Sequence, residues 1–324
     1  MPAGGLAVVL LSLFGTGAAW AQDPTALRAA CIVALKDRLD QPTPAATLNL
    51  CEVAVAANPK DAELQSWLAA ALANSGRSDE AGGTFRTAAE GGDVEAMKAF
   101  GLAQLRGATG TADSEAAFTW LRRAAEGGDS EAQNMVGTLY LNGVGVAADA
   151  QEAARWFRRA ITRGNADAQS NLAFLHLNGI GLPRDPAAAI SLYRAAAKQG
   201  SPIAQAALGG IYMQGDGVDH DAREAAQWFR RSAEQGWPPG QNNLGMLYLD
   251  GLGVERDPAK AEQWIRRAAQ AGHPHAQANL GQLYEQGLGV TQNREEALTW
   301  YRRAAAQGHP GAAEGVRRLG GVAD

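Results

Sequence analysis

The sequence has few of the residues that usually build catalytic and metal centres. It contains 2 cysteines and 5 histidines among 324 residues, and aromatic residues make up only 6% of the chain. It has neither the G-x-S-x-G nor the H-E-x-x-H motif that marks many hydrolases. Because no nucleophile, base or ligand set converges in the sequence, we predict no catalytic residues, no metal site and no cofactor.

An excess of positive charge and long hydrophobic runs are also missing. The formal net charge is −5, which provides no electrostatic footprint for a nucleic-acid partner. The apolar run Leu6–Phe14 is too short to cross a bilayer, and we expect no integral membrane segment. With 46% hydrophobic and 19% charged residues, the chain has the composition of a folded protein.

The first residues resemble a secretory signal. Leu6–Phe14 is followed by Ala19-Trp20-Ala21, which fits the small-residue pattern of a cleavage site, although no Lys or Arg precedes the run. We therefore predict that residues 1–21 are a signal peptide cleaved after Ala21. The mature chain is then expected in the periplasm or outside the cell.

The two cysteines, Cys31 and Cys51, lie at equal distances from Gln41, in a segment that breaks the helical pattern. In an antiparallel helical hairpin over residues 22–57, the two sulfur atoms would lie level with each other. An exported chain with such a pair favours a disulfide. The alternative is two buried free thiols that pack as small apolar residues.

An internal repeat of 36 residues dominates the rest of the chain. The tryptophans on this lattice are Trp120, Trp156, Trp228, Trp264 and Trp300. Glycine and tyrosine follow lattices of the same period, and residues 93–308 have room for six units. Each unit reads as two short helices, which we call helix A and helix B. In the second unit we expect helix A at about 130–142 and helix B at about 150–163, the latter capped by Asp149.

The segment G-V-G-V from Gly143 has two possible roles, as a phosphate-binding loop or as a connector between helices A and B. Similar glycine pairs begin at Gly179, Gly215, Gly251 and Gly287, always between the two helices and never after a strand. A phosphate loop requires a strand–turn–helix context at one site. We therefore interpret the pair as a connector whose glycines adopt positive φ.

The recurring pattern A-x-x-x-L-G-x-x-Y-x-x-G-x-G-V resembles the Sel1-like repeat, a relative of the tetratricopeptide repeat. In one unit it is matched by Ala276, Leu280, Gly281, Tyr284, Gly287, Gly289 and Val290. The upstream segment 58–92 resembles a tetratricopeptide hairpin, 93–308 holds six Sel1-like repeats, and 309–324 is a C-terminal half-repeat that caps the stack.

The resemblance implies an all-α, right-handed α-solenoid, a superhelix of stacked helix-turn-helix repeats whose helices A line a concave groove. Such proteins are generally adaptors for other proteins or peptides, and some exported bacterial members regulate sensor kinases. Others, with a cysteine pair in every repeat, are linked to β-lactam binding or hydrolysis. This chain has no cysteine in 93–308, which argues against that second branch.

Two positions on helix A vary between repeats while its packing positions repeat closely, which is the pattern expected of groove residues. The predicted partner-binding residues are Leu141, Asn142, Phe174, Leu177, Asn178, Met213, Asn242, Met246, Leu249 and Asp250. The apolar members would form a strip with a polar border, as binding surfaces often do. The alternative is that these side chains fill space against the neighbouring helix B.

The arginine doublets of helix B, such as Arg230-Arg231, could attract an anionic surface, but their place near helix C-termini favours a solvated face. We therefore predict a non-catalytic exported scaffold that binds a segment of a partner protein and regulates an envelope signalling or assembly process. The alternative is a ligand-binding protein or hydrolase for cell-wall or β-lactam-like molecules. The sequence specifies neither the partner nor the oligomeric state.

Overall fold

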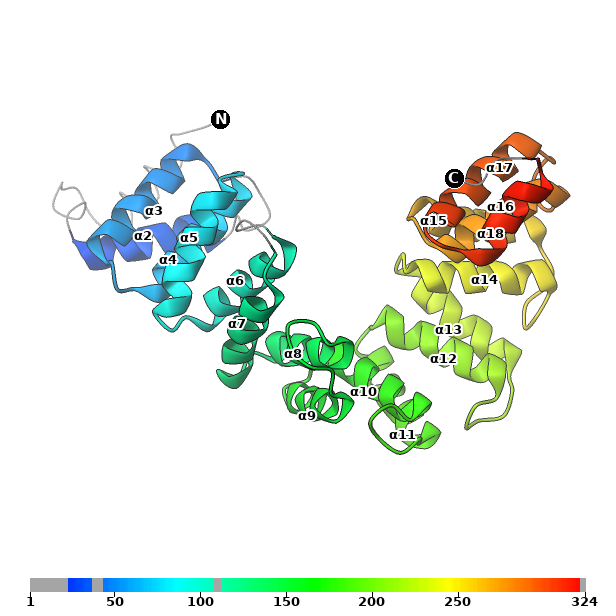
Figure 1. Ribbon diagram of the computed structural model, residues 1–324, viewed down its shortest axis with the longest axis horizontal. Helices are drawn as coiled ribbons and strands as arrows, with labels where there is room; N and C mark the ends of the chain where they lie inside the picture. The colour runs from blue at the N-terminus through cyan, green and yellow to red at the C-terminus, as the bar shows by residue number, and fades with distance from the viewer. Residues whose placement is uncertain (1–22, 37–42, 108–111, 321–324) are drawn as a thin grey trace. The chain divides into compact units, whose positions relative to one another are not determined.

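The computed structural model describes residues 23–36, 43–107 and 112–320, and these contain helices but no strands. The chain divides into two compact units, an N-terminal unit up to Asn165 and a C-terminal unit from Ala166 (Figure 1). The predicted signal peptide at 1–21 lies outside the described residues. No helix within the described ranges has both the length and the apolar character needed to span a membrane.

The helices of both units are short and nearly uniform, and successive helices pair as antiparallel hairpins. The N-terminal unit contains α2 (Pro24–Lys36), α3 (Ala45–Ala57), α4 (Ala62–Asn74), α5 (Ser78–Glu90), α6 (Val94–Arg106), α7 (Ser114–Glu126), α8 (Ser130–Asn142) and α9 (Ala150–Ile161). The C-terminal unit contains α10 (Ala166–Asn178), α11 (Pro186–Lys198), α12 (Pro202–Gln214), α13 (Ala222–Glu234), α14 (Pro238–Asp250), α15 (Pro258–Gln270), α16 (Pro274–Gln286), α17 (Arg294–Ala306) and α18 (Pro310–Arg318). In the repeats, even-numbered helices from α6 onward are helices A and odd-numbered ones are helices B, which gives the all-α solenoid of stacked hairpins that the sequence predicts.

Side-chain caps set where these helices begin, and the caps follow the repeat. Asp149 accepts hydrogen bonds from the backbone N–H groups of Gln151 and Glu152 at 2.9 and 3.0 Å, as predicted for the start of α9. Asp221 and Asn293 cap α13 and α17 in the same way. Each cap satisfies N–H groups that have no partner within the helix, and replacing one costs about 1 kcal/mol.

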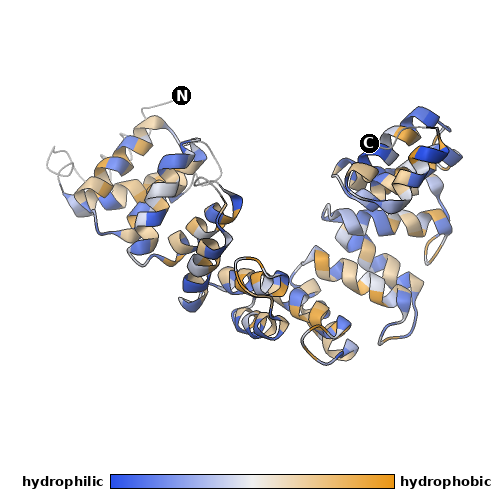
Figure 2. Ribbon diagram, viewed as in Figure 1, coloured by the Kyte–Doolittle hydropathy of each residue, from blue (hydrophilic) through white to orange (hydrophobic). Residues whose placement is uncertain are grey.

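From the second repeat onward, helix A supplies the centre of the core through one leucine or valine per repeat. These residues are Val136, Leu172, Leu208, Leu244 and Leu280, all buried. Small residues beside them allow close approach: a Cβ on Gly245 would lie 2.6 Å from a side-chain carbon of Ile265 on the paired helix B. Hydrophobic and hydrophilic residues are interspersed along the helices of both units (Figure 2).

The glycine pairs between helices A and B are connectors, as predicted. Gly143 and Gly145 have φ of +67° and +69°, a region that residues with a side chain rarely adopt. The second glycine also touches the preceding repeat, because a Cβ on Gly145 would lie 1.9 Å from the carbonyl oxygen of Ser114 at the start of α7. The connector thus has a packing role in the stack.

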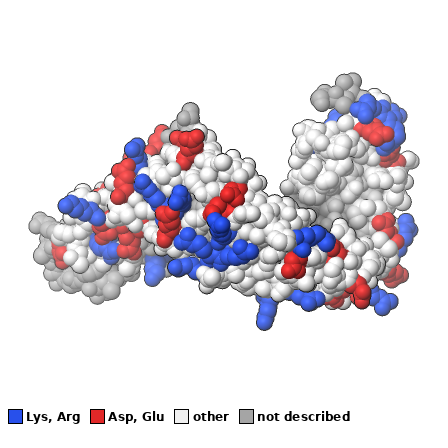
Figure 3. Space-filling view, turned by 60° about the horizontal axis from the view of Figure 1, so that its bottom comes forward, with Lys and Arg blue, Asp and Glu red and all other residues white. Residues whose placement is uncertain are grey.

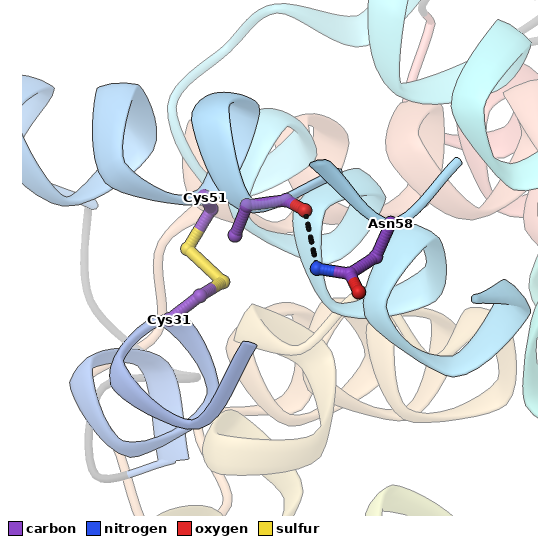
Figure 4. The surroundings of a disulfide bond; sticks show 4 residues. Cys31, Cys51 and Asn58 are labelled. Atoms are coloured by element: carbon purple, nitrogen blue, oxygen red, sulfur yellow. Dashed lines mark hydrogen bonds between the residues drawn. A yellow bond between two sulfur atoms is a disulfide. The ribbon is translucent and has the colours of Figure 1, made fainter. Parts of the chain in front are cut away.

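The predicted disulfide joins Cys31 on α2 to Cys51 on α3, with the two Cα atoms 5.0 Å apart (Figure 4). Both cysteines are fully buried in a core shared with Leu27, Leu48 and Leu64 of α4. Asn58 also closes the hairpin, since its side-chain amide donates to the carbonyls of Pro24 and Ala54 at 2.9 and 3.0 Å. The covalent link and these bonds hold α2 against α3.

In the C-terminal unit, helices A lie on the inner side of the stack. Helix α14 contacts both α12 and α16, and α16 contacts α18, whereas no two of the described helices B (α11, α13, α15 and α17) approach one another to the same degree. The inner elements of a curved stack lie closer together than the outer ones. Helices A therefore form the concave layer of this unit.

Candidate functional site

The candidate site is the surface of the C-terminal unit formed by one face of each helix A, which we call the inner face. Two residues of each helix define it: Phe174 and Leu177 on α10, Gly210 and Met213 on α12, Met246 and Leu249 on α14, and Gln282 and Glu285 on α16. The residues seven positions before the first of each pair, among them Ile203, fall on the same face by helical spacing.

Among the residues of the predicted apolar strip, Phe174 has the most solvent-exposed side chain. Its side chain is 46% exposed, whereas Leu177, Met213, Met246 and Leu249 are half-buried. Met213 packs on the core of α13 and α14, and Met246 and Leu249 pack on the core of α15 and α16. These three side chains therefore fill space between successive repeats and also present part of their surface on the inner face.

The predicted polar border has a mixed environment. Asn178 and Asp250 are exposed, and the Asn178 amide donates to the carbonyl of Phe174 at 2.9 Å. Asn242, however, is only 7% exposed and accepts a hydrogen bond from Asn279 at 2.9 Å. That bond links α14 to α16, so Asn242 ties two helices A together and offers little surface to a partner.

Leu141 and Asn142, the remaining predicted site residues, lie on α8 in the N-terminal unit. Leu141 is half-buried and Asn142 is exposed at the last position of the helix. Their membership of the binding site stays a prediction, as does that of the eight residues in the C-terminal unit.

A side-chain network closes the inner face at its C-terminal end. Arg318 of α18 donates two hydrogen bonds to the carboxylate of Glu285, at 2.8 and 2.6 Å, and the Tyr301 hydroxyl donates a third at 2.7 Å. The bonds from Arg318 and Tyr301 lower the pKa of Glu285, while burial and the Glu285 carboxylate raise the pKa of Tyr301. The network lines a cavity of about 410 Å³ that Gln282 and His309 also border.

Three histidines lie beside this network. Nδ1 of His275 and Nε2 of His309 are 3.0 Å apart, and Nδ1 of His309 accepts from the backbone N–H of Ala312 at 3.2 Å. His273 caps α16 through its own Nδ1. Burial lowers the pKa of His273 and of His309, with a further contribution from His275. Within the described ranges, no group of three or more His, Cys, Asp or Glu side chains is placed to hold a metal ion.

The arginine doublets of helix B are engaged within the stack. In two doublets the first arginine reaches the tyrosine of the next helix A: Arg230 donates to the Tyr248 hydroxyl at 3.1 Å and Arg266 to that of Tyr284 at 2.8 Å. The second arginine lies over its own tryptophan, with Arg231 4.5 Å from the Trp228 ring centre. Each doublet thus has packing partners, which the 18-residue spacing between arginine and tyrosine could have indicated.

A glutamine that recurs in helices A at the repeat period was not predicted as a structural residue from the sequence. The residues are Gln133, Gln169, Gln205, Gln241 and Gln277, one in each helix A from α8 to α16. The amides of Gln205 and Gln277 donate to the carbonyls of Ala197 and Ala269 on the preceding helix B, at 3.4 and 3.2 Å, so these buried side chains join successive repeats. Because these glutamines recur at the 36-residue period of the repeat, the sequence alone could have indicated that they have a structural role.

The basic side chains of the C-terminal unit are unevenly distributed between its helices. Helices A (α10, α12, α14 and α16) contain no Lys or Arg, whereas each helix B carries at least two. In the space-filling view, a broad face of this unit is free of charged side chains, which gather along its margins (Figure 3). The inner face is thus mainly uncharged.

Comparison with protein families and solved structures identifies relatives. The Sel1 repeat family matches six consecutive units, at 94–129, 130–165, 166–201, 202–237, 238–273 and 274–309. A Sel1 repeat protein from Oxalobacter formigenes is 32% identical, with 75% of this chain and 99% of that chain covered and a TM-score of 0.70. No curated protein matches the chain.

Two more distant structures share the fold. The protective antigen c5321 of uropathogenic Escherichia coli, which displays an SLR fold, is 24% identical over 94% of this chain and 73% of that chain, with a TM-score of 0.53. Yeast Tom70 is 15% identical over 85% of this chain and 58% of its own, with a TM-score of 0.54. At these identities the likeness concerns the fold alone.

Proposed function

This chain belongs to the Sel1 repeat family, a fold that commonly serves as a protein–protein interaction scaffold, and we propose that it binds a segment of a partner protein on the inner face of its C-terminal unit. The observation that carries the proposal is Phe174, a large aromatic side chain that is 46% exposed on a helix A. Aromatic residues left open on a concave surface are typical anchors for a binding partner.

The variation between repeats supports the same surface. Helix A repeats leucine or valine where it packs, yet the position of Phe174 is Gly210, Met246 and Gln282 in the following repeats. A packing role alone would favour the same residue in every unit, because the units meet through equivalent contacts. The variable positions are free to match a ligand, and the methionines offer adaptable apolar contacts.

The proposed location is the periplasm or the outside of the cell, with a non-catalytic role in envelope signalling or assembly. The Cys31–Cys51 disulfide supports it, because such bonds persist in oxidising compartments. The predicted cleavage after Ala21 is part of the same proposal.

Affinity capture with the mature chain, residues 22–324, tests the function. A partner retained by the natural sequence should be lost with Phe174→Asp, by about thirtyfold in affinity if Phe174 is a hot spot. Leu252→Asp is the matched variant, because Leu252 is 43% exposed but lies in the connector after α14. Retention that survives Phe174→Asp, or falls equally with Leu252→Asp, would refute the inner-face site.

A further inference from the structure

We infer that the partner segment is apolar and cationic, and that it lacks carboxylates where it crosses the inner face; this rests on the proposed function. The first support is the absence of Lys and Arg from the four helices that form the surface. Helices α10, α12, α14 and α16 contain no Lys or Arg over their whole lengths. A carboxylate of a partner would therefore lose its water on this face without gaining an opposite charge.

The one arginine that the repeat places on the inner face is already neutralised. Arg318 of α18 occupies the position that Phe174 and Gln282 hold in their repeats, and it makes a bidentate pair with Glu285. A bidentate arginine–carboxylate pair satisfies both groups in one geometry. Binding an acidic segment here would require breaking that pair, so Arg318 does not turn the face into an anion site.

Two other carboxylates of helices A have no cationic partner within the part of the chain that the structure describes. Asp167 and Asp250 are exposed, and no ion pair of the described residues includes either of them. Asp250 is the last residue of α14, where the helix dipole already places negative charge. Arg256 of the following connector donates to the carbonyl of Leu249 at 3.0 Å but forms no ion pair with Asp250, so this carboxylate is available to a Lys or Arg of the partner.

The inference that the partner segment carries apolar side chains rests on exposed apolar residues of the inner face. Phe174 on α10 and Ile203 on α12 are 46% and 42% exposed, and the half-buried Met213 on α12 and Met246 on α14 also present part of their side chains. A segment with apolar side chains would cover these residues, and a basic residue at its edge would meet Asp250. Arg230, Arg231 and Arg266 of helices B are engaged with tyrosine or tryptophan, and no basic residue of the described helices forms an ion pair with Asp250.

A displayed library of random linear peptides, selected against the immobilised mature chain, tests the inference. Selected peptides should be enriched in Lys, Arg and apolar residues and depleted in Asp and Glu relative to the unselected library. A synthetic peptide from this set should bind about two- to fivefold more weakly to Asp250→Asn, the range expected for one exposed ion pair. Asp250→Lys should weaken it further, and added salt should reduce binding to the natural sequence more than to Asp250→Asn.

Glu234→Lys is the matched charge reversal, because Glu234 is exposed at the last position of α13, a helix B. It should leave peptide affinity unchanged. Peptides that are lost with Phe174→Asp but are rich in Asp and Glu, or that bind Asp250→Lys as well as the natural chain, would overturn the inference and leave the inner-face site standing. Selection that is indifferent to Phe174→Asp would overturn the proposed function as well.

Discussion

The first described hairpin, α2–α3, and the last described helix, α18, are held in place by different kinds of interaction. At the N-terminus, α2 and α3 are joined by a buried disulfide within an apolar core. At the C-terminus, the half-repeat α18 is held by an exposed arginine on Glu285, by a histidine contact and by a few buried residues such as Val316. Among the described helices, α2 and α18 each pack on helices from one side of the stack, so other contacts contribute more to holding them. The first end is secured covalently, while the second depends on polar groups that respond to solvent conditions.

The largest effect is expected from the N-terminal end. Replacing Cys31 and Cys51 together by serine removes the cross-link and should destabilise this hairpin by about 3 kcal/mol. Urea unfolding followed by circular dichroism, with hydrogen exchange to assign the loss to α2 and α3, measures it. The amides of α16–α18 should keep their protection. Equal protection of α2 in the reduced and oxidised natural chain would contradict the stabilising role of the bond.

An intermediate effect is expected from the polar network at the other end. Glu285→Gln keeps the side-chain size but removes the charge that Arg318 and Tyr301 hold, so α18 should lose about 1 kcal/mol of local stability. Hydrogen exchange of the α18 amides reports the change. Glu314→Gln, on the exposed side of the same helix, should have no comparable effect. If both variants exchange alike, the pair with Arg318 does not secure the cap.

The smallest effect is a pH dependence of the same helix. The pKa of His309 in the folded chain lies below its ordinary value of 6.5, because of burial and the neighbouring His275. The unfolded state therefore binds more protons as pH falls through 6.5, and stability that is complete above that pH is lost progressively below it. Protonation of Nδ1 also removes the acceptor that caps Ala312. Exchange of the Ala312 amide should accelerate as the pH is lowered from 7.5 to 5.5, after correction for the intrinsic rate.

Two further histidines, His275 and His273, lie close to this site, while Glu285 and Arg318 border the same cavity. His309→Ser separates their contributions, since serine caps a helix without titrating, as Ser201 does at α12. The cap of that variant should be much less sensitive to pH. An unchanged pH dependence in His309→Ser would assign the effect to the other groups.

Much of the fold could be predicted because its determinants are local and repeated. Helix α8 has the predicted bounds, and α9 ends two residues earlier than expected, where Thr162 and Arg163 already form the turn. Caps such as Asp149 act on N–H groups two or three residues away, so sequence spacing is enough to find them. The disulfide followed from the symmetry of one hairpin.

The candidate site was less predictable because its residues meet across repeats. Spacing placed Met246 and Phe174 at equivalent positions, yet one is half-buried on the next core and the other is open. Asn242 was expected at a polar border and instead bonds Asn279 on the following helix A. Such differences depend on the volumes of side chains in the neighbouring repeat, which no single helix pattern contains.

The sequence by itself determined the 36-residue period, the alternation of helices A and B, the glycine connectors and the cysteine pairing. These features follow from contacts within a turn, a helix or a hairpin. Tertiary structure alone decided which side chains of the inner face stay exposed, how the arginine doublets are engaged and that Arg318 is neutralised by Glu285. The reason is physical: exposure and charge pairing depend on distances between separate helices, and those distances are set only when the repeats pack together.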